Sequence, residues 1–473
     1  MSHSIRRFAV AALVALVACP YAADAATLAV TATNPPANAM APATTTISVT
    51  FDRAVSLGQF NANRFRVFGR GTGTKSGSFT LSNANQTVTF TPTTPFSAGE
   101  IVMVNLKNDL VATDASLMRS AGYAFQFTVA SQAGAMDFEF LNTMSNRTGG
   151  PGGPQTRIYG AQATDLNHDR YLDLATVNEV SGDVRVALNT ADGSGLYFTF
   201  LTPKTIGLES SPNEQADFDN DGDTDGCFAA ASGERVDILL GNGDGTYGSS
   251  QSINLGGEPH GIAALDVDGD ADWDIVTARV NGGDLALMLN DGNGNFGAPT
   301  FFDAGVDGEY GLQTADMNDD GIMDLVVAGR NSEEIRTMLG NGDGTFTGGA
   351  IQSSGGNTWV VAVGDLDGDG DLDVTAANDG DANGAVLFND GSGDFSAPVI
   401  YGSDGHTPST DLGDLDGDGD LDWILSVYGA GKWIMFENDG SGSFTEVEEF
   451  VAPDNPSCAI MLDFDNDGDI DLA

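Results

Sequence analysis

The stretch Asp365-Leu-Asp-Gly-Asp-Gly-Asp-Leu-Asp373 is the clearest of seven copies of one nine-residue pattern. It carries a carboxylate at every second position and a glycine at two of the positions between them. Because like charges this close repel one another, five carboxylates in nine residues indicate a cation among them. Calcium takes about six to eight oxygen ligands and needs a flexible backbone around it, which glycine supplies. The stretch therefore predicts a calcium-binding loop.

The seven copies recur with a regular period. Their first aspartates are spaced by 52, 49, 50, 49, 49 and 49 residues, which indicates a repeat architecture. In each unit an apolar segment runs into the loop and three more follow; in the fifth unit these are 372–377, 385–388 and 398–401, the last after the glycine hairpin 389–395. Four predicted strands in about 50 residues are typical of a β-propeller blade. Residues 159–473 are therefore expected to form a seven-bladed β-propeller.

The loops, the Gly-x-Gly-x-Phe hairpins and the period resemble the FG-GAP or VCBS repeats of the integrin α-subunit propeller type, over about residues 136–473. The resemblance implies calcium ligation by side chains at loop positions 1, 3, 5 and 9 and by the main-chain carbonyl at position 7. The residues themselves favour the same division, since Tyr171 and Ile322 stand at position 7 of two loops and isoleucine offers only its carbonyl oxygen.

Up to seven calcium ions are expected, held by the residues at positions 1, 3, 5, 7 and 9 of each loop. These are Asp165, Asn167, Asp169, Tyr171 and Asp173 in loop 1; Asp217, Asp219, Asp221, Asp223 and Asp225 in loop 2; Asp266, Asp268, Asp270, Asp272 and Asp274 in loop 3; Asp316, Asn318, Asp320, Ile322 and Asp324 in loop 4; Asp365, Asp367, Asp369, Asp371 and Asp373 in loop 5; Asp414, Asp416, Asp418, Asp420 and Asp422 in loop 6; and Asp463, Asp465, Asp467, Asp469 and Asp471 in loop 7. Loop 1 is the least complete, because Arg170 replaces the glycine at position 6 and only three carboxylates remain. The alternative is that the loops are solvated acidic turns, because Asp and Gly are common turn formers.

The seventh unit stops at Asp471-Leu-Ala473, after its first strand, its loop and the start of its second strand. Propellers commonly complete the last blade with a strand from the other terminus. Within the linker 132–158, the alternating segment Met136–Leu141 could supply that outer strand. A third strand would still be missing, so the sequence is expected to be a fragment whose natural C-terminus lies further on.

Residues 26–131 differ in composition from the rest of the chain. They carry seven basic and four acidic residues, against ten and 63 in residues 132–473, and this shift marks a domain boundary. Short β-rich runs separated by Pro, Asn and Gly predict an Ig-like β-sandwich, and the whole fold is therefore expected to be all-β. Four segments resemble the Ig-like domain of bacterial surface-layer and other exported proteins, which implies a spacer or accessory module: Asn34-Pro-Pro-Ala-Asn, Val49-Thr-Phe-Asp52, Phe90-Thr-Pro92 and Phe125-Gln-Phe-Thr.

Residues 1–25 read as a secretory signal peptide. Arg6 and Arg7 precede the apolar run 8–18, and Ala23-Asp24-Ala25 supplies a cleavage site. Eleven apolar residues are too few to span a bilayer and no longer run follows, so the chain is expected to be secreted or held at the cell surface without a transmembrane segment. Leu16-Val17-Ala18-Cys19 also resembles a lipoprotein box, which would make Cys19 a lipid anchor.

A net charge of −49 argues against nucleic-acid binding, which requires a basic surface. The sequence has no Gly-x-Ser-x-Gly or His-Glu-x-x-His motif, so no enzymatic activity is expected. The segments that precede each first strand should gather on the face away from the calcium loops. They include Pro259-His260, Glu309-Tyr310, Thr358-Trp359 and His406-Thr407.

Trp and Tyr favour interfaces and sugar-like ligands, although packing at strand edges would also explain them. The sequence therefore predicts a monomeric adhesion or ligand-binding module for a surface protein or carbohydrate. Two alternatives stay open. One is a propeller-based polysaccharide lyase or hydrolase that uses Glu214 and Glu309. The other is a passive cell-wall or matrix component.

Overall fold

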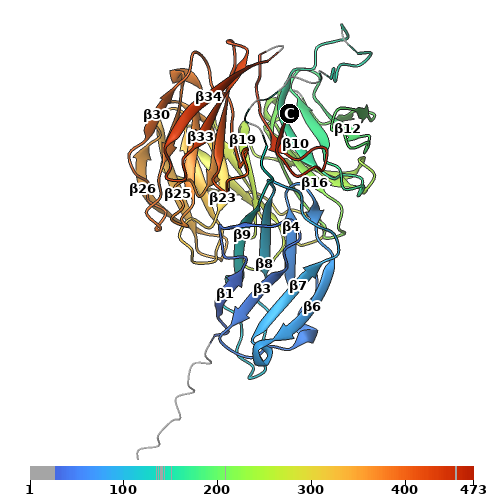
Figure 1. The fold of residues 1–473 in the computed structure, drawn as a ribbon, viewed down its shortest axis with the longest axis vertical. Helices are drawn as coiled ribbons and strands as arrows, with labels where there is room; N and C mark the ends of the chain where they lie inside the picture. Colours follow the sequence, from blue (N-terminus) through green and yellow to red (C-terminus); the bar gives the residue numbers. More distant parts are fainter. Residues whose placement is uncertain are drawn as a thin grey trace, which may run out of the picture.

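The computed structural model describes residues 27–473 except 135, 137, 139–141, 143, 151, 208, 453 and 454. The predicted signal peptide and Cys19 lie outside these residues. Figure 1 shows an N-terminal β-sandwich in blue, below a ring of sheets coloured from green to red. The predicted all-β fold, with an Ig-like sandwich followed by propeller blades, is confirmed.

The sandwich consists of two sheets around one apolar core. The first has the order β1 (Val30–Asn34), β3 (Ile47–Phe51), β7 (Thr87–Pro92) and β6 (Gly77–Ser82). The second has the order β2 (Met40–Ala41), β9 (Tyr123–Val129), β8 (Ile101–Leu106), β4 (Phe65–Gly69) and β5 (Gly73–Thr74). Two 3-10 turns, η1 (Leu57–Gln59) and η2 (Asn83–Asn85), connect strands. Strand β3 shows the alternation that builds such a core, because Ile47, Val49 and Phe51 are buried and the residues between them are not.

The described part of the propeller contains six sheets of at least four antiparallel strands and a two-stranded seventh. In chain order, which is also the order from the hub outward, they are β10 (Ile158–Thr164), β11 (Asp173–Asn178), β12 (Asp183–Asn189) and β13 (Phe198–Phe200), with β14 (Lys204–Thr205) also paired to β12; β15 (Ser210–Ala216), β16 (Asp225–Ala230), β17 (Arg235–Gly241) and β18 (Tyr247–Asn254); β19 (Pro259–Leu265), β20 (Asp274–Arg279), β21 (Asp284–Met288) and β22 (Thr300–Phe302); β23 (Glu309–Ala315), β24 (Asp324–Gly329), β25 (Glu334–Gly340) and β26 (Phe346–Ser353); β27 (Thr358–Gly364), β28 (Asp373–Asn378), β29 (Asn383–Leu387) and β30 (Val399–Gly402); β31 (Thr410–Gly413), β32 (Asp422–Val427), β33 (Lys432–Asn438) and β34 (Phe444–Val451); and β35 (Met461–Leu462) with β36 (Asp471–Leu472). The 3-10 turns η3 (Ala231–Gly233) and η4 (Asp379–Asp381) lie in the second and fifth units.

The seventh unit is joined to the first by the same bond that joins neighbouring units elsewhere. Asn290, Asn389 and Asn438 each donate a side-chain hydrogen bond of 2.8 Å to a loop carbonyl of the preceding unit. The equivalent Asn189 of the first unit donates to the Phe464 carbonyl at 2.9 Å. Phe464 also packs in one apolar cluster with residues of the first unit. The two ends of the blade series therefore meet.

The strand predicted to close the seventh unit, Met136–Leu141, falls largely outside the described residues. Its described members Met136 and Phe138 are partly buried against a cluster that contains Met461 and Ile470. The Phe138 N–H donates to Glu448 of β34 at 3.3 Å. The segment thus lies beside the sixth and seventh units.

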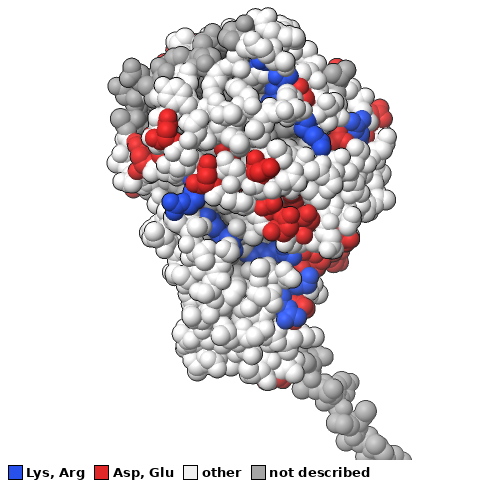
Figure 2. Space-filling view, turned by 90° about the vertical axis from the view of Figure 1, so that its right-hand side faces the viewer, with Lys and Arg blue, Asp and Glu red and all other residues white. Residues whose placement is uncertain are grey.

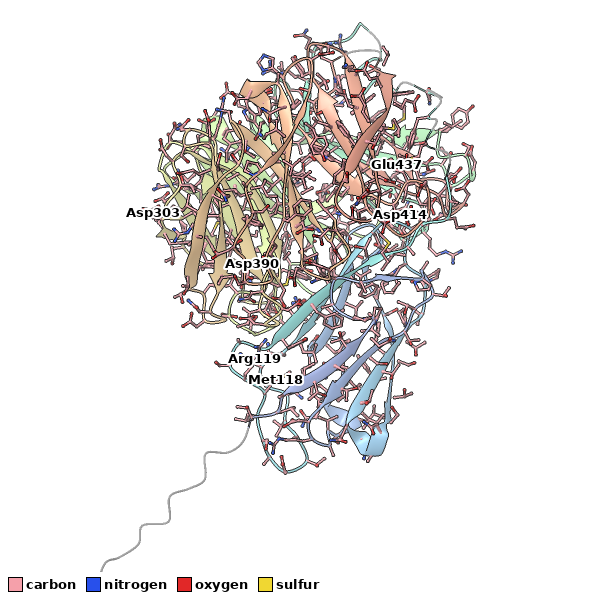
Figure 3. All side chains as sticks on the ribbon, turned by 60° about the vertical axis from the view of Figure 1, so that its left-hand side comes forward. Met118, Arg119, Asp303, Asp390, Asp414 and Glu437 are labelled. Carbon is pink, nitrogen blue, oxygen red and sulfur yellow. The ribbon has the colours of Figure 1, made fainter. Side chains whose placement is uncertain are left out.

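The sandwich sits on the face of the propeller that carries the acidic loops, and it contacts all seven of them. Hydrogen bonds or ion pairs link Gly71 to Asp165 in loop 1, Thr74 to Asp217 in loop 2, Arg66 to Asp272 in loop 3, Arg119 to Gly321 in loop 4, Asn38 to Gly370 in loop 5, and Ser131 to Asp414 in loop 6. In loop 7, Ile470 packs in one apolar cluster with Ala98 of the sandwich, and the linker residue Gln132 donates to the Asp467 carbonyl. Figure 3 labels Arg119 on the sandwich and Asp414 on the propeller. The contact has an apolar part as well, since Phe68 packs edge-on against Trp273 with 5.6 Å between ring centroids.

Of the two roles expected for the Ig-like domain, spacer or accessory module, packing on the propeller favours the accessory module. Charge complementarity contributes: Arg66 pairs with Asp272, and Lys107 lies 4.0 Å from Asp270. Figure 2 shows basic side chains along the boundary of the two lobes, with acidic side chains next to them.

Candidate metal loops and central pocket

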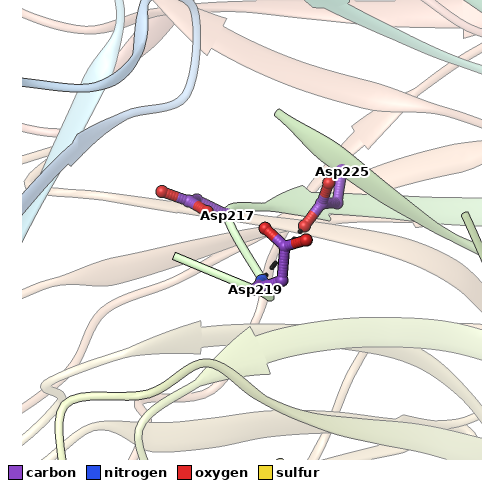
Figure 4. Close-up of side chains that lie close together, drawn as sticks. All are labelled: Asp217, Asp219 and Asp225. Atoms are coloured by element: carbon purple, nitrogen blue, oxygen red, sulfur yellow. Dashed lines mark hydrogen bonds between the residues drawn. The ribbon is translucent and has the colours of Figure 1, made fainter. Parts of the chain in front are cut away.

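Each acidic loop connects the innermost strand of a unit to its second strand. The connection brings together the carboxylates at positions 1, 3 and 9, as Figure 4 shows for Asp217, Asp219 and Asp225. In five loops these three side chains offer oxygen atoms that all lie within 4.8 Å of one another: loops 2, 3, 5, 6 and 7. In loops 1 and 4 position 3 is Asn167 or Asn318, so the acidic triad is one carboxylate short.

Several buried carboxylate oxygens in these clusters have no hydrogen-bond partner among the described residues. They are Oδ1 of Asp217, Asp414 and Asp463 at position 1, and Oδ1 of Asp268 at position 3. Leaving a buried polar atom unpaired costs about 1 to 3 kcal/mol, and more when the group is charged. A cation at the centre of the triad would satisfy these atoms. The repeated triads could therefore hold metal ions.

Burial and mutual repulsion raise the pKa of the position 1 carboxylates. Burial is the larger cause, and the neighbouring acids of the same loop add to it. The pKa rises to about 6 for Asp217 and to about 7 for Asp266 and Asp463. Without a cation, these carboxylates are therefore partly protonated near neutral pH.

Positions 5 and 7 are arranged differently from the triad. The position 5 carboxylate accepts the main-chain N–H of position 7, as in the 2.9 Å bond from Asp223 to Asp221. The position 7 side chains of Asp223 and Asp272 turn to neighbours, namely His168 at 2.7 Å and Arg66. Their carbonyl oxygens are then the groups they can offer to an ion, and ligation there stays a prediction.

Position 9 has a second role that sequence reasoning missed. In loop 2, Oδ2 of Asp225 accepts the N–H of Phe218 and Oδ1 accepts the N–H of Gly241, both at 2.7 Å. Loop 5 repeats this arrangement with Asp373, Leu366 and Asn389. The side chain thus ties the loop to the outer hairpin of its own unit, which explains a carboxylate here even without metal. Burial raises the pKa of Asp225 to about 8.

A cavity of about 290 Å³ lies at the hub of the ring, between the innermost strands. Its wall is mixed: the polar side chains of Gln162, Glu214, Gln215 and Gln313 line it together with apolar ones such as Leu312 and Val361. Three of the polar residues stand three residues before the first aspartate of their loop, so they occupy equivalent positions on neighbouring strands. The sandwich contributes Arg70 to the same cavity.

Aromatic side chains gather at the end of the hub that lies away from the loops. His260 stacks on Tyr310, with 3.3 Å between ring centroids, and Tyr310 lies 5.2 Å from Trp359. Tyr159 lies 6.4 Å from both His260 and Trp359. The Arg330 guanidinium lies 4.5 Å from the Trp359 ring and 4.9 Å from the Tyr310 ring.

Sequence reasoning named three members of this aromatic cluster and missed Tyr159. The signal was present, because Tyr159, His260, Tyr310 and Trp359 each stand six residues before the first aspartate of a loop. His406 stands eight residues before its loop and does not line the cavity; it contacts Asp379 at 3.2 Å instead. Burial lowers the pKa of His260 to about 3, so its ring is neutral.

The FG-GAP-like repeat model matches the chain five times. The matched segments are 217–277, 266–327, 316–376, 365–425 and 414–473, which together span more than half of the chain. The chain belongs to the FG-GAP-like repeat family. A bacterial Ig-like domain model matches residues 24–129 of this FG-GAP repeat protein. Both resemblances seen in the sequence are confirmed.

The solved structures that are similar to this FG-GAP repeat protein have low sequence identity to it. A protein from Agrocybe aegerita, described as recognising non-reducing terminal N-acetylglucosamine, is 20% identical with a TM-score of 0.49, over 68% of this chain and 89% of its own. A putative 6-phosphogluconolactonase from Bacteroides uniformis is 11% identical with a TM-score of 0.50, over 87% of this chain and 100% of its own. A Lactobacillus plantarum protein is 12% identical with a TM-score of 0.50, over 84% and 98%. No curated protein sequence matches the chain.

The two glutamates named for the enzymatic alternative are not brought together in the pocket. Glu214 lines the cavity, whereas Glu309 is fully buried at the start of β23 and does not line it. Cys227 and Cys458 are both free thiols. Among the described residues, no helix is long and apolar enough to cross a membrane.

Proposed function

We propose that the chain is an exported, calcium-stabilised and non-catalytic propeller that binds carbohydrate in the cavity at its hub. The composition of that cavity carries the proposal. Aromatic rings stand at its mouth, and amide side chains line its wall among apolar residues. Rings that offer apolar faces beside groups that donate and accept hydrogen bonds suit a hydroxylated ligand.

Calcium is the cation that we propose for the loops. It prefers carboxylate and carbonyl oxygens, and the unpartnered buried oxygens of Asp217, Asp414 and Asp463 are such atoms. Extracellular modules bind calcium with a Kd of about 0.1 to 1 mM. At about 1 mM calcium each occupied loop would then stabilise the fold by about 0.4 to 1.4 kcal/mol. Up to seven loops share this role, which makes the metal a structural stabiliser.

A carbohydrate fits the cavity better than a protein partner. Stable protein interfaces bury about 800 Å² on each side, whereas this site is a concave space of about 290 Å³. The lining holds one guanidinium, from Arg70, and one carboxylate, from Glu214, which lie 3.5 Å apart. The charges offset each other, so the cavity favours a neutral ligand.

The carboxylate count supports binding over hydrolysis. Glycoside hydrolysis ordinarily uses two carboxyl groups that flank the scissile bond. Among the described residues that line the cavity, Glu214 supplies the single carboxylate. We therefore propose a binding site that leaves its ligand intact, on a monomer that is secreted or held at the cell surface.

A glycan array tests the proposal with the wild-type protein and the Trp359→Ala variant, each in about 2 mM calcium, which exceeds the Kd of about 0.1 to 1 mM for such modules. We expect the wild-type to bind a defined set of glycans and Trp359→Ala to bind them roughly tenfold more weakly, because one stacked ring contributes about 1 kcal/mol or more.

Tyr428→Ala is the matched control. Tyr428 is an exposed aromatic residue that bridges to His406 and does not line the cavity, so its removal should leave glycan binding unchanged. An equal loss in both variants, or binding of a surface protein in place of glycans, would contradict the assignment of the site.

A further inference from the structure

The sandwich reaches into the hub through one short segment, Gly69-Arg-Gly-Thr-Gly73, at the end of β4. Arg70 in this segment lines the central cavity on one side. It also lines a space of only about 10 Å³ on the other side, together with Ile101 and Gln126 of the sandwich. The guanidinium therefore stands between the cavity and the body of the sandwich, at the end of the hub opposite the aromatic mouth.

A buried carboxylate holds this segment in place. Oε2 of Glu100 accepts the main-chain N–H groups of Gly71 and Thr72, both at 2.8 Å. Oε1 accepts the Thr72 hydroxyl at 2.7 Å and the Ser97 N–H at 2.8 Å. A side chain at Gly69 would place its Cβ 2.4 Å from Oε2 of Glu100, so glycine is required there.

The segment is also fixed to the propeller. The Gly71 carbonyl accepts the N–H of Asp165 at 2.8 Å, and the Arg70 carbonyl accepts a hydrogen bond from Nε2 of Gln215 on β15. Bonds on both sides thus determine where the Arg70 side chain enters the hub.

The Arg70 side chain keeps donors for a ligand. Its Nη2 lies 3.3 Å from Oε1 of Gln313 and 3.5 Å from Oε2 of Glu214. A guanidinium has five N–H donors in a planar fork, and the Arg70 side chain is 23% exposed. Beside it, Oε1 of the buried Gln215 has no hydrogen-bond partner among the described residues and lines the same cavity. The Arg70 donors therefore face the cavity at its sandwich end, with the buried acceptor of Gln215 behind them.

We propose that Arg70 closes the hub from the sandwich side and determines specificity there, so that the cavity admits only the terminal unit of a carbohydrate chain. This inference rests on the proposed function. A channel open at both ends would let a chain thread through it. A pocket with one mouth and a polar floor takes a chain end, with the first unit at Arg70 and the next units at the aromatic mouth.

The test uses isothermal titration with the best-bound oligosaccharide from the array. A second titration uses the same oligosaccharide extended by one sugar at the end that enters the pocket. Wild-type protein is expected to bind the extended form at least tenfold more weakly. Equal affinity for both forms would overturn the inference and leave the proposed function standing, whereas the absence of any glycan binding would overturn both.

Variants then examine Arg70 itself. Arg70→Met keeps the length of the side chain and removes the donors, and we expect at least a tenfold loss of affinity with the melting temperature nearly unchanged. Arg64→Met is the control, because Arg64 flanks the opposite end of β4 and pairs with Asp109, and it does not line the cavity. If Arg70→Met does not fold, Arg70→Lys is used instead. This variant keeps the positive charge but removes the planar array of N–H donors of the guanidinium. Unchanged affinity in the folded variant would overturn the role of Arg70.

Discussion

Glu309 lies in an environment that is unfavourable for a charged side chain. The side chain is fully buried, and neither of its oxygens has a hydrogen-bond partner among the described residues. Burial raises its pKa, and the nearby charges of Asp303, Asp284 and Asp307 raise it further. The folded protein therefore holds the Glu309 proton more tightly than the unfolded chain. This group stabilises the fold below its ordinary pKa near 4.5 and loses that contribution as pH rises through the raised value.

Glu309→Gln should therefore raise the stability at neutral pH. We expect the free energy of unfolding to increase by about 1 kcal/mol at pH 8, because an ionised and unpaired buried group is removed. The gain should disappear near pH 4, where the wild-type side chain is protonated in both states. Urea unfolding at the two pH values measures the difference.

The control for that experiment is Glu437→Gln. Glu437 is an exposed residue of β33, labelled in Figure 3, and its replacement removes the same formal charge. A similar gain in the control, or a gain in Glu309→Gln that persists at pH 4, would show that burial of Glu309 is not the cause.

At the scale of the elements, the hairpin asparagines join one unit to the next. Asn189 donates to the Phe464 carbonyl of the seventh unit, and Asn438 donates to the Leu366 carbonyl of the fifth. Both side chains are buried. The two hydrogen bonds are of the same kind, but the one from Asn189 crosses the seam where the first and seventh units meet.

Asn189→Ala and Asn438→Ala should each lower the free energy of unfolding by about 1 to 3 kcal/mol, because each leaves a buried carbonyl without its donor. Only Asn189→Ala should speed amide hydrogen exchange in β35 and β36. Mass spectrometry after exchange resolves these segments. Equal exchange there in both variants would mean that the seam does not depend on this bond.

The repeated elements were accessible from sequence because their signals are local. A period near 49 residues and a carboxylate at every second position fixed the strands and loops of each unit. Tyr159 could have been added from its register alone. The double use of Asp225 was missed, because a 16-residue separation from Gly241 that recurs in other units does not itself show which side chain bonds which main-chain N–H.

At the scale of the whole molecule, the loops lie between two domains and could not be predicted to do so. The sequence gives no periodic signal for the packing of a sandwich on a propeller. The one indication was the difference in charge: the sandwich has seven basic and four acidic residues, whereas the propeller is strongly acidic. Arg66 and Lys107 realise that complementarity. Arg70 and Glu100 were missed for the same reason, because their roles exist only across or beneath the domain contact.

Calcium removal should therefore loosen the domain contact as well as the blades. With excess EGTA we expect the melting temperature to fall by about 5 to 15 °C, given about 1 kcal/mol for each occupied loop. Small-angle scattering should show a larger radius of gyration, because the sandwich loses its contact with the propeller. Calorimetry measures the melting temperature. Re-added calcium should restore both the melting temperature and the radius of gyration.

An unchanged melting temperature in EGTA would contradict a stabilising metal. A lower melting temperature with an unchanged radius of gyration would instead keep the metal role and contradict its coupling to the sandwich. The Arg66→Met variant separates the two effects, because it removes the ion pair with Asp272 and leaves every acidic triad intact.

The seating of the sandwich on all seven loops also has a consequence for the order in which the protein is made. The ribosome delivers the sandwich before the seventh loop, yet the surface that receives the sandwich includes Ile470 of that loop, which packs with Ala98. The sandwich is therefore synthesised before any blade, and the propeller surface that it contacts is complete only after the seventh loop has been made. Complete docking therefore requires all seven loops, and a chain interrupted anywhere in the repeats would lack part of the surface that contacts the sandwich.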